Sequence, residues 1–463
     1  MNDFFFLLLL YRMESVVSQE LDYKVRTVSH PTYQLSQVIQ QAGGLTSTIS
    51  VAGGNESIFE LPPKVMNLSK SVLSFTTTPA ASASTNIMHI DGITTIKQIQ
   101  LYTRTGVFLC DLTDVHKYTN ITIRRNTSKS ELMTMDNGSA AAGFFEGLRH
   151  ASFEAVTSEN HCRPALTAGT MTGVSLSEPS YVIAGTNAAA DPVVAHKIKL
   201  GRIYDTIFSI NKDQYFNDTV YLRIVWGKSP DCMYRATAAN DIITGAAAYA
   251  SDIALTNLRL FLAVEQNPVI NQEIMSKAHA GTLTYQVPYV YYNKVNVATS
   301  TTHNVSVRYN RAHGRKLKKI YWAPYHSNET GRLTYDKNNI AVAGAADKVS
   351  EYYTMVNNTR LTQFNYNTVV GDDWMDKREL LLNSSIGTSN EYYYNWVHVE
   401  DFSHIQSLKY KDHDESNLDD GLILENEVKY DIASTTAAVA LAHYVYAVCL
   451  KDITISNAGI TLI

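Results

Sequence analysis

His89 and Asp91, a histidine and an aspartate two positions apart, are the residues in the sequence whose types and spacing point most directly to a metal site. Such a pair on one strand, completed by a distant histidine, builds the facial triad that holds non-haem iron. Asp91 is followed by glycine, however, and an Asp-Gly pair is typical of a turn. We interpret the motif as a turn and predict no metal site and no cofactor. Third ligands are easy to find in a chain with 14 histidines, for example His150, His161 and His196.

Three other short motifs are no more specific. Gly227-Lys-Ser229 resembles the end of a phosphate-binding loop, but Leu222 stands where that loop needs glycine. Gly371-Asp-Asp373 has the aspartates of a polymerase metal site and none of its other parts, so we expect a hairpin loop. His398-Val-Glu400 only repeats the His-x-acid spacing. Because the chain also lacks GxSxG, HExxH and CxxC motifs, we predict no catalytic residues and no enzyme activity.

One cluster of basic residues lies beside Tyr309, Tyr321 and Trp322. It fits contact with a nucleic acid, an acidic neighbour or an anionic membrane. It also fits the solvated outer face of a strand, turn and strand, or a nuclear import signal. We take it as the candidate partner-contact site, with the members Arg308, Arg311, Arg315, Lys316, Lys318 and Lys319.

Composition limits the function classes further. The chain has 463 residues, a formal net charge of -5, and only 18% charged residues. It therefore lacks the strong basic field of a protein that holds DNA by bulk electrostatics. Its 29 tyrosines suit half-buried strands and large subunit contacts, since tyrosine offers both area and a hydroxyl. The 4 cysteines are far apart, which argues against a zinc site or a disulfide framework and favours a reducing compartment.

Alternation with a period of two residues recurs along the chain. In Thr219–Trp226, valine, leucine, isoleucine and tryptophan share one face, and His303–Asn310 repeats the pattern. Such segments are half-buried strands, and many short ones separated by turns predict a sandwich or barrel. Helical periodicity is scarce and predicts only short helices, at Ser130–Met135, Ala140–His150 and Ile270–Ala278.

The same plan occurs twice in the sequence. An alanine-rich stretch leads into Leu258–Val264 in the first half and into Tyr444–Leu450 in the second. A weaker echo pairs Ile96–Tyr102 with Leu361–Asn367. The first half is longer, and we assign its extra residues to a long loop at about 127–192, of the kind that carries contacts on a rigid sandwich.

These patterns divide the chain into four parts. We expect an N-terminal arm at 1–50, a first unit at 51–268, a connector at 269–284 and a second unit at 285–463. Within the arm, the apolar run Phe4–Leu10 is too short to span a bilayer. Either translation starts at Met13 and residues 1–12 are a gene-model artefact, or the run docks on a neighbouring subunit or a membrane.

The order and spacing of the blocks resemble a known family over most of residues 55–463. The family is the double jelly-roll major capsid proteins of polinton-like viruses, virophages, large DNA viruses of eukaryotes and tailless membrane-containing phages. Each block is a loose apolar and polar pattern. The blocks are Ser57–Pro63, Ser71–Thr77, Ile96–Asp111, Lys199–Asp213, Tyr221–Trp226, Leu258–Glu265 and Tyr444–Leu450.

The resemblance implies an all-β fold of two consecutive eight-stranded jelly-roll sandwiches, with a few short helices in loops and in the connector. It also implies a structural capsid protein, assembled inside the infected host cell and located in the virion. Homotrimers would form pseudo-hexagonal capsomers that meet neighbouring capsomers, a penton protein and minor capsid proteins. The basic cluster would then face the genome or an inner membrane, and no small-molecule substrate is expected.

Two alternatives share the strand pattern. A jelly-roll glycan-binding or attachment protein would be a small oligomer with affinity for sugars. A jelly-roll metal-dependent enzyme would require bound metal or turnover that is lost on His89→Ala. Neither needs two units of this length and order.

Overall fold

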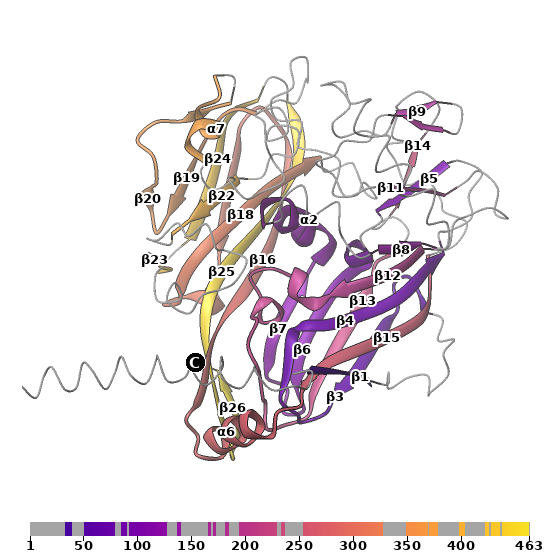
Figure 1. The fold of residues 1–463 in the computed structure, drawn as a ribbon. Coiled ribbons are helices and arrows are strands. Elements are labelled where there is room, and N and C mark those ends of the chain that lie inside the picture. The colour runs from indigo at the N-terminus through magenta and orange to yellow at the C-terminus, as the bar shows by residue number, and fades with distance from the viewer. Residues whose placement is uncertain are drawn as a thin grey trace, which may run out of the picture.

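The structure of the 463-residue chain is a computed structural model. The described part of the chain is almost entirely antiparallel β-structure, arranged as two sandwiches (Figure 1). The structure describes residues 33–38, 51–78, 85–89, 92–126, 137–139, 165–167, 170–172, 181–184, 194–228, 233–236, 253–326, 349–368, 370–377, 398–402, 422–425, 427–435 and 438–462.

Eight strands form the first sandwich, and alternation of buried and half-buried residues shows which face of a strand points to the core. In β13, Val220, Leu222, Ile224 and Trp226 are buried and the residues between them are half-buried, as the sequence predicts. The eight strands are β1 (Tyr33–Val38), β3 (Glu56–Leu61), β4 (Met66–Thr78), β6 (Ile96–Thr103), β7 (Phe108–Thr113), β12 (Val194–Lys199), β13 (Val220–Trp226) and β15 (Ala254–Glu265).

The strand order identifies the topology of this sandwich. Its two sheets read β1-β15-β4-β12 and β3-β13-β6-β7. Numbered along the chain from one to eight, the sheets are therefore 1-8-3-6 and 2-7-4-5. Strands one and eight, two and seven, three and six, and four and five pair as neighbours, as when one long hairpin is rolled up. This order is a jelly roll of two Greek keys.

The second sandwich repeats the order. Its sheets read β16-β25-β18-β22 and β17-β24-β19-β20, which is again 1-8-3-6 and 2-7-4-5. The all-β fold of two eight-stranded jelly rolls is confirmed. The eight strands are β16 (Leu283–Ser300), β17 (His303–Arg308), β18 (Lys316–His326), β19 (Val349–Val356), β20 (Thr359–Arg360), β22 (His398–Asp401), β24 (Glu427–Thr435) and β25 (Val439–Ser456).

Shorter strands extend these sheets or pair with one another. Among them, β21 lengthens the edge made by β20, because both pair with β19. They are β2 (Val51–Ala52), β5 (Thr85–His89), β8 (Asn137–Ser139), β9 (Ala165–Thr167), β10 (Thr170–Thr172), β11 (Tyr181–Ala184), β14 (Met233–Ala236), β21 (Tyr366–Asn367), β23 (Leu422–Ile423) and β26 (Gly459–Leu462).

Three α-helices occur in the described residues. The expected helix at Ile270–Ala278 is α6 (Pro268–His279), which Asn267 caps by accepting from the backbone N–H of Val269. In Figure 1, α6 lies at the bottom, where the chain passes from the first sandwich to the second. Two helices were missed by periodicity, α2 (Val115–Asn126) and α7 (Asp372–Lys377). The helices expected at Ser130–Met135 and Ala140–His150 lie outside the described residues.

The repeated plan is confirmed at one point and wrong at another. The two strands that follow the alanine-rich stretches, β15 and β25, are the eighth strands of their sandwiches. The counterpart of β6 is β19, however, and not Leu361–Asn367, which follows the short fifth strand β20 and includes β21. Hydrophobic alternation cannot distinguish neighbouring strands that bury the same face.

Some expectations concern the ends and loops of the units. Strand β1 lies within the range assigned to the N-terminal arm, and it pairs with β15 as the first strand of the first sandwich. Residues 1–12 are outside the described part. The long segment at 127–192 connects the fifth and sixth strands, and its described portions are β8 to β11. No helix in the described residues is long and apolar enough to cross a membrane.

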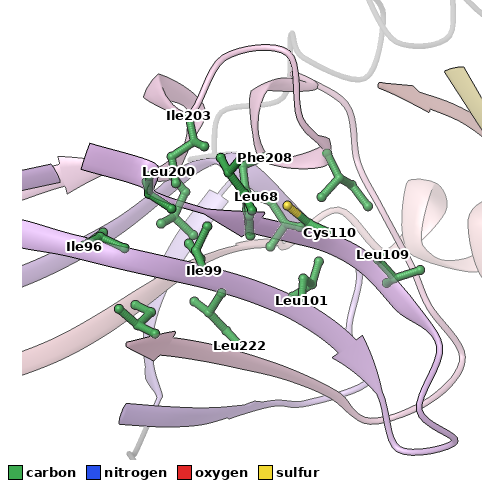
Figure 2. Close-up of a cluster of buried hydrophobic side chains, with 14 of the residues drawn as sticks. Leu68, Ile96, Ile99, Leu101, Leu109, Cys110, Leu200, Ile203, Phe208 and Leu222 are labelled. Carbon is green, nitrogen blue, oxygen red and sulfur yellow. The ribbon is translucent and has the colours of Figure 1, made fainter. Parts of the chain in front are cut away.

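The first core lies between its two sheets. Figure 2 shows Ile99 and Leu101 of β6 and Leu222 of β13 pointing toward Leu68, Leu200 and Phe208. All six side chains have at most trace exposure. Turns η2 (Leu200–Arg202) and η3 (Ile207–Ser209) thus contribute to the core beside the strands.

Candidate assembly interface

The sheet β16-β25-β18-β22 of the second sandwich is buried on both faces. Along β25, Val445 and Cys449 lie in the core of the second sandwich. Tyr446 and Val448 belong instead to the core cluster that continues from the first sandwich. This double burial explains why the sequence from Tyr444 to Leu450 is apolar at nearly every position, since neither face meets water. The first sandwich covers the outer face of this sheet.

Helix α2 is the element that covers the centre of this face, and Figure 1 shows it between the two sandwiches. Tyr118, which is fully buried, packs its ring against Tyr446 at 4.9 Å and edge-on against Tyr321 at 6.0 Å between centroids. The ammonium of the preceding residue, Lys117, lies 4.2 Å from the centroid of the Tyr325 ring. Aromatic pairs and cation–π contacts of this kind add to the free energy of plain burial.

Asp114 precedes α2 and makes the first polar junction between the sandwiches. Its φ of 52° is in the left-handed region, which aspartate tolerates better than most residues. Its carboxylate accepts a short hydrogen bond from Tyr292 of β16 and pairs with Lys97 at 2.7 Å. Burial alone would raise the pKa of Asp114, but the charges of His116 and Lys97 outweigh it and lower the pKa. The carboxylate is therefore ionised at neutral pH.

Asp205 makes the second junction, from the turn between η2 and η3. Tyr321 donates a 2.6 Å hydrogen bond to Asp205 Oδ2, and Lys319 Nζ lies 3.3 Å from Oδ1. Burial and the Asp205 charge raise the pKa of Tyr321, which stays protonated as a donor. All three residues are almost fully buried. Breaking such a pair leaves an uncompensated charge, so the junction fixes how the sandwiches meet.

A third set of contacts lies near the connector. The backbone N–H of Tyr215 donates to Tyr285 Oη at 3.1 Å, and Asn217 Nδ2 donates to the carbonyl of Ser456 at 3.2 Å. The three junctions are distributed along the sheet. Together with the continuous apolar cluster between them, they hold the two sandwiches in one arrangement.

The predicted partner-contact cluster is divided by the fold. Lys318 and Lys319 are buried, and Lys319 is engaged with Asp205, so neither belongs to a solvated basic surface. The Arg308 side chain is 76% exposed and pairs with Glu427 at 3.5 Å. Lys316 begins β18 and pairs in register with Ile423 of β23. Arg311 and Arg315 lie together near Lys451, which the sequence analysis missed because it is remote in the chain.

The His398-Val-Glu400 motif forms a buried ion network and not a metal site. His398 Nε2 lies 2.7 Å from Glu400 Oε1, and Lys377 Nζ donates to Oε2 at 2.9 Å. Burial raises the pKa of Glu400, but His398 and Lys377 outweigh it and hold the pKa at about 2. The Lys377 ammonium thus stands where a metal cation would have to bind the Glu400 carboxylate. No group of three or more His, Cys, Asp or Glu side chains in the described residues could hold a metal.

The remaining motif residues have structural roles where the structure describes them. His196 is buried, with Nε2 2.8 Å from Thr77 Oγ1. The hairpin loop expected at Gly371-Asp-Asp373 is wrong, because Asp372 and Asp373 begin α7 and the buried Asp373 accepts from Tyr352 at 3.2 Å. Asp91, His150 and His161, and the side chain of His89, lie outside the described residues.

Comparison with known proteins gives structural neighbours only. No family model and no curated protein matches the sequence. The PBCV-1 virus capsid matches with a TM-score of 0.49 and 9% identity, over 94% of this chain and 98% of that chain. The mavirus major capsid protein matches with a TM-score of 0.48 and 10% identity, over 95% and 92%. The Faustovirus major capsid protein has a TM-score of 0.48 and 9% identity, over 93% and 92%.

The chain has a double jelly-roll fold. The strand order of its two sandwiches shows this fold. Sequence identities of 9–10% to the structural neighbours give no evidence about function. A fold hosts many functions, so the role of this double jelly roll has to be argued from its surfaces. The contact between its two sandwiches is the surface that the described residues define in most detail.

Proposed function

We propose that this chain is a major capsid protein, which trimerises into pseudo-hexagonal capsomers that tile an icosahedral shell. One observation carries the proposal. The chain contains one jelly roll twice, and the two copies meet by unlike surfaces, with the fifth-strand edge of one against the outer sheet face of the other. A contact between unlike surfaces can repeat from chain to chain and close into a ring.

The second sandwich offers the surface that the first has already used. In the first sandwich, β7 and the following α2 make the contact. The equivalent elements of the second sandwich are β20, β21 and α7. In both sandwiches a helix follows the fifth strand, α2 in the first and α7 in the second. Three of the largest exposed apolar side chains lie here, namely Phe364, Val370 and Met375 at 58%, 69% and 59% exposure. Exposed apolar residues gathered on one segment indicate an interaction surface.

The first sandwich offers the complementary face. The outer face of its β1-β15-β4-β12 sheet corresponds to the face that is covered in the second sandwich. Leu35 on β1 is 54% exposed, and Phe261 on β15 and Val72 on β4 are half-buried. Phe261 and Val72 are opposite one another in the ladder, and Leu35 is opposite Ala263, so all share one face.

Charge agrees with this pairing. In the contact within the chain, Asp114 at the start of α2 meets tyrosine on the sheet face. The counterpart Asp372 begins α7, and the sheet face that it would approach bears Lys197, Lys199 and Arg259. An acidic helix start against a basic sheet face selects the orientation of approach.

Three copies joined in this way would place six jelly rolls around one axis, a near-hexagonal block that tiles a shell. Neighbouring capsomers, a penton protein at the five-fold vertices and minor capsid proteins would be the further partners, and the genome or an inner membrane would lie within. We assign the protein to the virion on the same basis.

Paired substitutions test the ring. Val370→Asp alters the helix-side surface and Leu35→Asp alters the sheet face, while Val269→Asp, at a residue 57% exposed on α6, is the matched control. By light scattering, the wild type and Val269→Asp should have three times the 51.6 kDa chain mass, and the other two variants should be monomers. Trimers of both Val370→Asp and Leu35→Asp would reject this interface, and a monomeric wild type would reject the capsomer itself.

A mixture of the two variants tests whether the contact is head-to-tail. Each chain keeps one intact surface, so one Leu35→Asp chain can bind one Val370→Asp chain and the assembly must stop there. Sedimentation of the mixture should give a two-chain species. A mixture that stays monomeric at high concentration, or that returns to trimers, would contradict unlike surfaces.

A further inference from the structure

Three basic residues of the second sandwich, Arg311, Arg315 and Lys451, lie near one another. Leu317 of β18 is opposite Cys449 of β25, so Arg315, two residues before Leu317, and Lys451, two residues after Cys449, lie at the same end of this strand pair. Like charges that come close across neighbouring strands are destabilising. The Lys451 ammonium lies 3.5 Å from the centroid of the Tyr289 ring, which holds it in place.

Arg311 is the third cation. Tyr291 donates a 3.1 Å hydrogen bond to the backbone carbonyl of Arg311, and its ring lies 4.9 Å from that of Tyr289. The same two tyrosines therefore position the turn that carries Arg311 and the strand that carries Lys451. Burial, and then the charges of Arg315 and Arg311, lower the pKa of Lys451 to about 8. The three charges are thus close enough to repel one another.

No carboxylate balances these charges within the described residues. Arg311, Arg315 and Lys451 form none of the ion pairs that the described part of the chain contains. Asp111 is the carboxylate that acts on Tyr289, but it accepts from the amides of Gln98 and Gln100 at 3.0 and 2.9 Å. Three cations without a counter-charge are costly to hold together unless an anion joins them.

We propose that Arg311, Arg315 and Lys451 form a binding site for a phosphate oxyanion. Two guanidinium groups present forked donors that match the oxygens of a phosphate, and the ammonium adds a point charge. A carboxylate would balance only one of the three charges, whereas a phosphate dianion balances two. The site does not depend on the capsid role, since it lies within one chain.

Inorganic phosphate is the first probe, added to the full chain at constant ionic strength with chloride as the reference. Arg311→Gln removes one cation, and Arg360→Gln is the matched control. Arg360, like Arg311, is an exposed arginine of the second sandwich, but it lies at a different edge, 4.2 Å from the centroid of the Tyr353 ring. Phosphate should raise the melting temperature of the wild type and of Arg360→Gln, and Arg311→Gln should bind phosphate at least about tenfold more weakly.

A second readout separates a binding site from a purely structural cluster. Without phosphate, Arg311→Gln should be as stable as the wild type or more stable, because it relieves repulsion between like charges. A structural role for Arg311 predicts the reverse. Failure of phosphate to stabilise the wild type beyond chloride, or equal responses of the two variants, would overturn the proposal.

A short oligothymidine distinguishes the source of the phosphate. Binding that is tighter than that of inorganic phosphate and is lost in Arg311→Gln would assign the site to a nucleic-acid backbone. Binding that is weaker would assign it to a free phosphate or phosphate monoester. Both results support a phosphate site, and they differ from the trimer test because monomers suffice.

Discussion

Tyr321 donates a 2.6 Å hydrogen bond to Asp205, and this bond joins the second jelly roll to the first. Lys319 approaches the other oxygen of the same carboxylate at 3.3 Å. Asp205 therefore serves a donor and a cation from the neighbouring unit while almost fully buried itself. This buried charge is therefore one of the contacts that fix how the two sandwiches meet.

Replacing that charge should destabilise the protein strongly. Asp205→Asn keeps a side chain that tolerates the φ of 53° and can still accept from Tyr321. The change therefore removes only the negative charge that faces Lys319. Loss of the carboxylate charge that faces a buried ammonium costs about 3 kcal/mol of unfolding free energy, which urea titration can measure. Glu56→Gln, which breaks an exposed pair with Arg223, should cost less than about 1 kcal/mol. Equal losses of unfolding free energy in Asp205→Asn and Glu56→Gln would show that the buried pair stabilises the fold no more than an exposed pair does.

A second loss is expected inside the second sandwich. Glu400→Gln leaves the buried Lys377 without its carboxylate partner at 2.9 Å, so we expect a loss of about 3 kcal/mol. The exposed pair of Lys277 and Glu273 is the comparison, and Glu273→Gln should change unfolding by less than about 0.5 kcal/mol. A Glu400→Gln protein with wild-type stability would mean that Lys377 is neutral or rearranges freely.

A chain of hydrogen bonds near Trp322 fixes the protonation of two buried histidines. Trp322 Nε1 can only donate, so at 3.0 Å it requires His443 Nδ1 as acceptor. His443 Nε2 then donates to His303 Nδ1 at 3.3 Å, and His303 Nε2 donates to the carbonyl of Ser300 at 3.1 Å. Adding a proton to either ring places two donors face to face. The chain therefore holds only while both histidines are neutral.

Acid should weaken the protein through this chain. Burial and then the neighbouring His303 lower the pKa of His443 to about 3, against an ordinary value of 6.5. The unfolded state binds more protons between these values, so this stabilising contribution is complete above pH 6.5 and falls by about 1.4 kcal/mol per pH unit below it. His443→Gln should flatten the dependence of the urea midpoint on pH between 7 and 5. His313→Gln, at an exposed histidine, should leave the slope unchanged, and an unchanged slope in His443→Gln would refute the assignment.

The two described cysteines should be inert in the native protein. Cys110 and Cys449 are free and buried, and burial raises the pKa of Cys449 to about 12. Thiolates are the reactive form, so maleimide should label neither residue at pH 8 and both after unfolding. Peptide mass spectrometry separates them from the other cysteines of the chain. Rapid native labelling at Cys449 would mean that the β25 sheet opens readily.

Much of the fold could be predicted because strand periodicity is a local property. Alternation at Val220 to Trp226 and the apolar strands after the alanine-rich stretches have the places that the sequence predicts. Helix α2 was missed because it is buried against Tyr321 and Tyr446 of a distant strand pair, so its burial is not visible as a simple apolar stripe. Tertiary packing overrides local propensity at such positions.

The candidate site was harder to predict because charge alone does not reveal burial. The run from Arg308 to Lys319 has the composition of a basic surface, yet Lys319 points to Asp205, which is 114 residues away in sequence. Lys451 is brought to Arg315 only by the pairing of the third and eighth strands. Neither relation leaves a signal in neighbouring residues, so one sequence alone could not supply it.

Electron microscopy of the purified wild-type chain tests the capsomer most directly. Averaged projections should show a hexagonal outline with three-fold symmetry. The size of the particles should fit three chains of 51.6 kDa. A uniform population of monomers at micromolar concentration, without hexagonal particles or shells, would contradict the proposal.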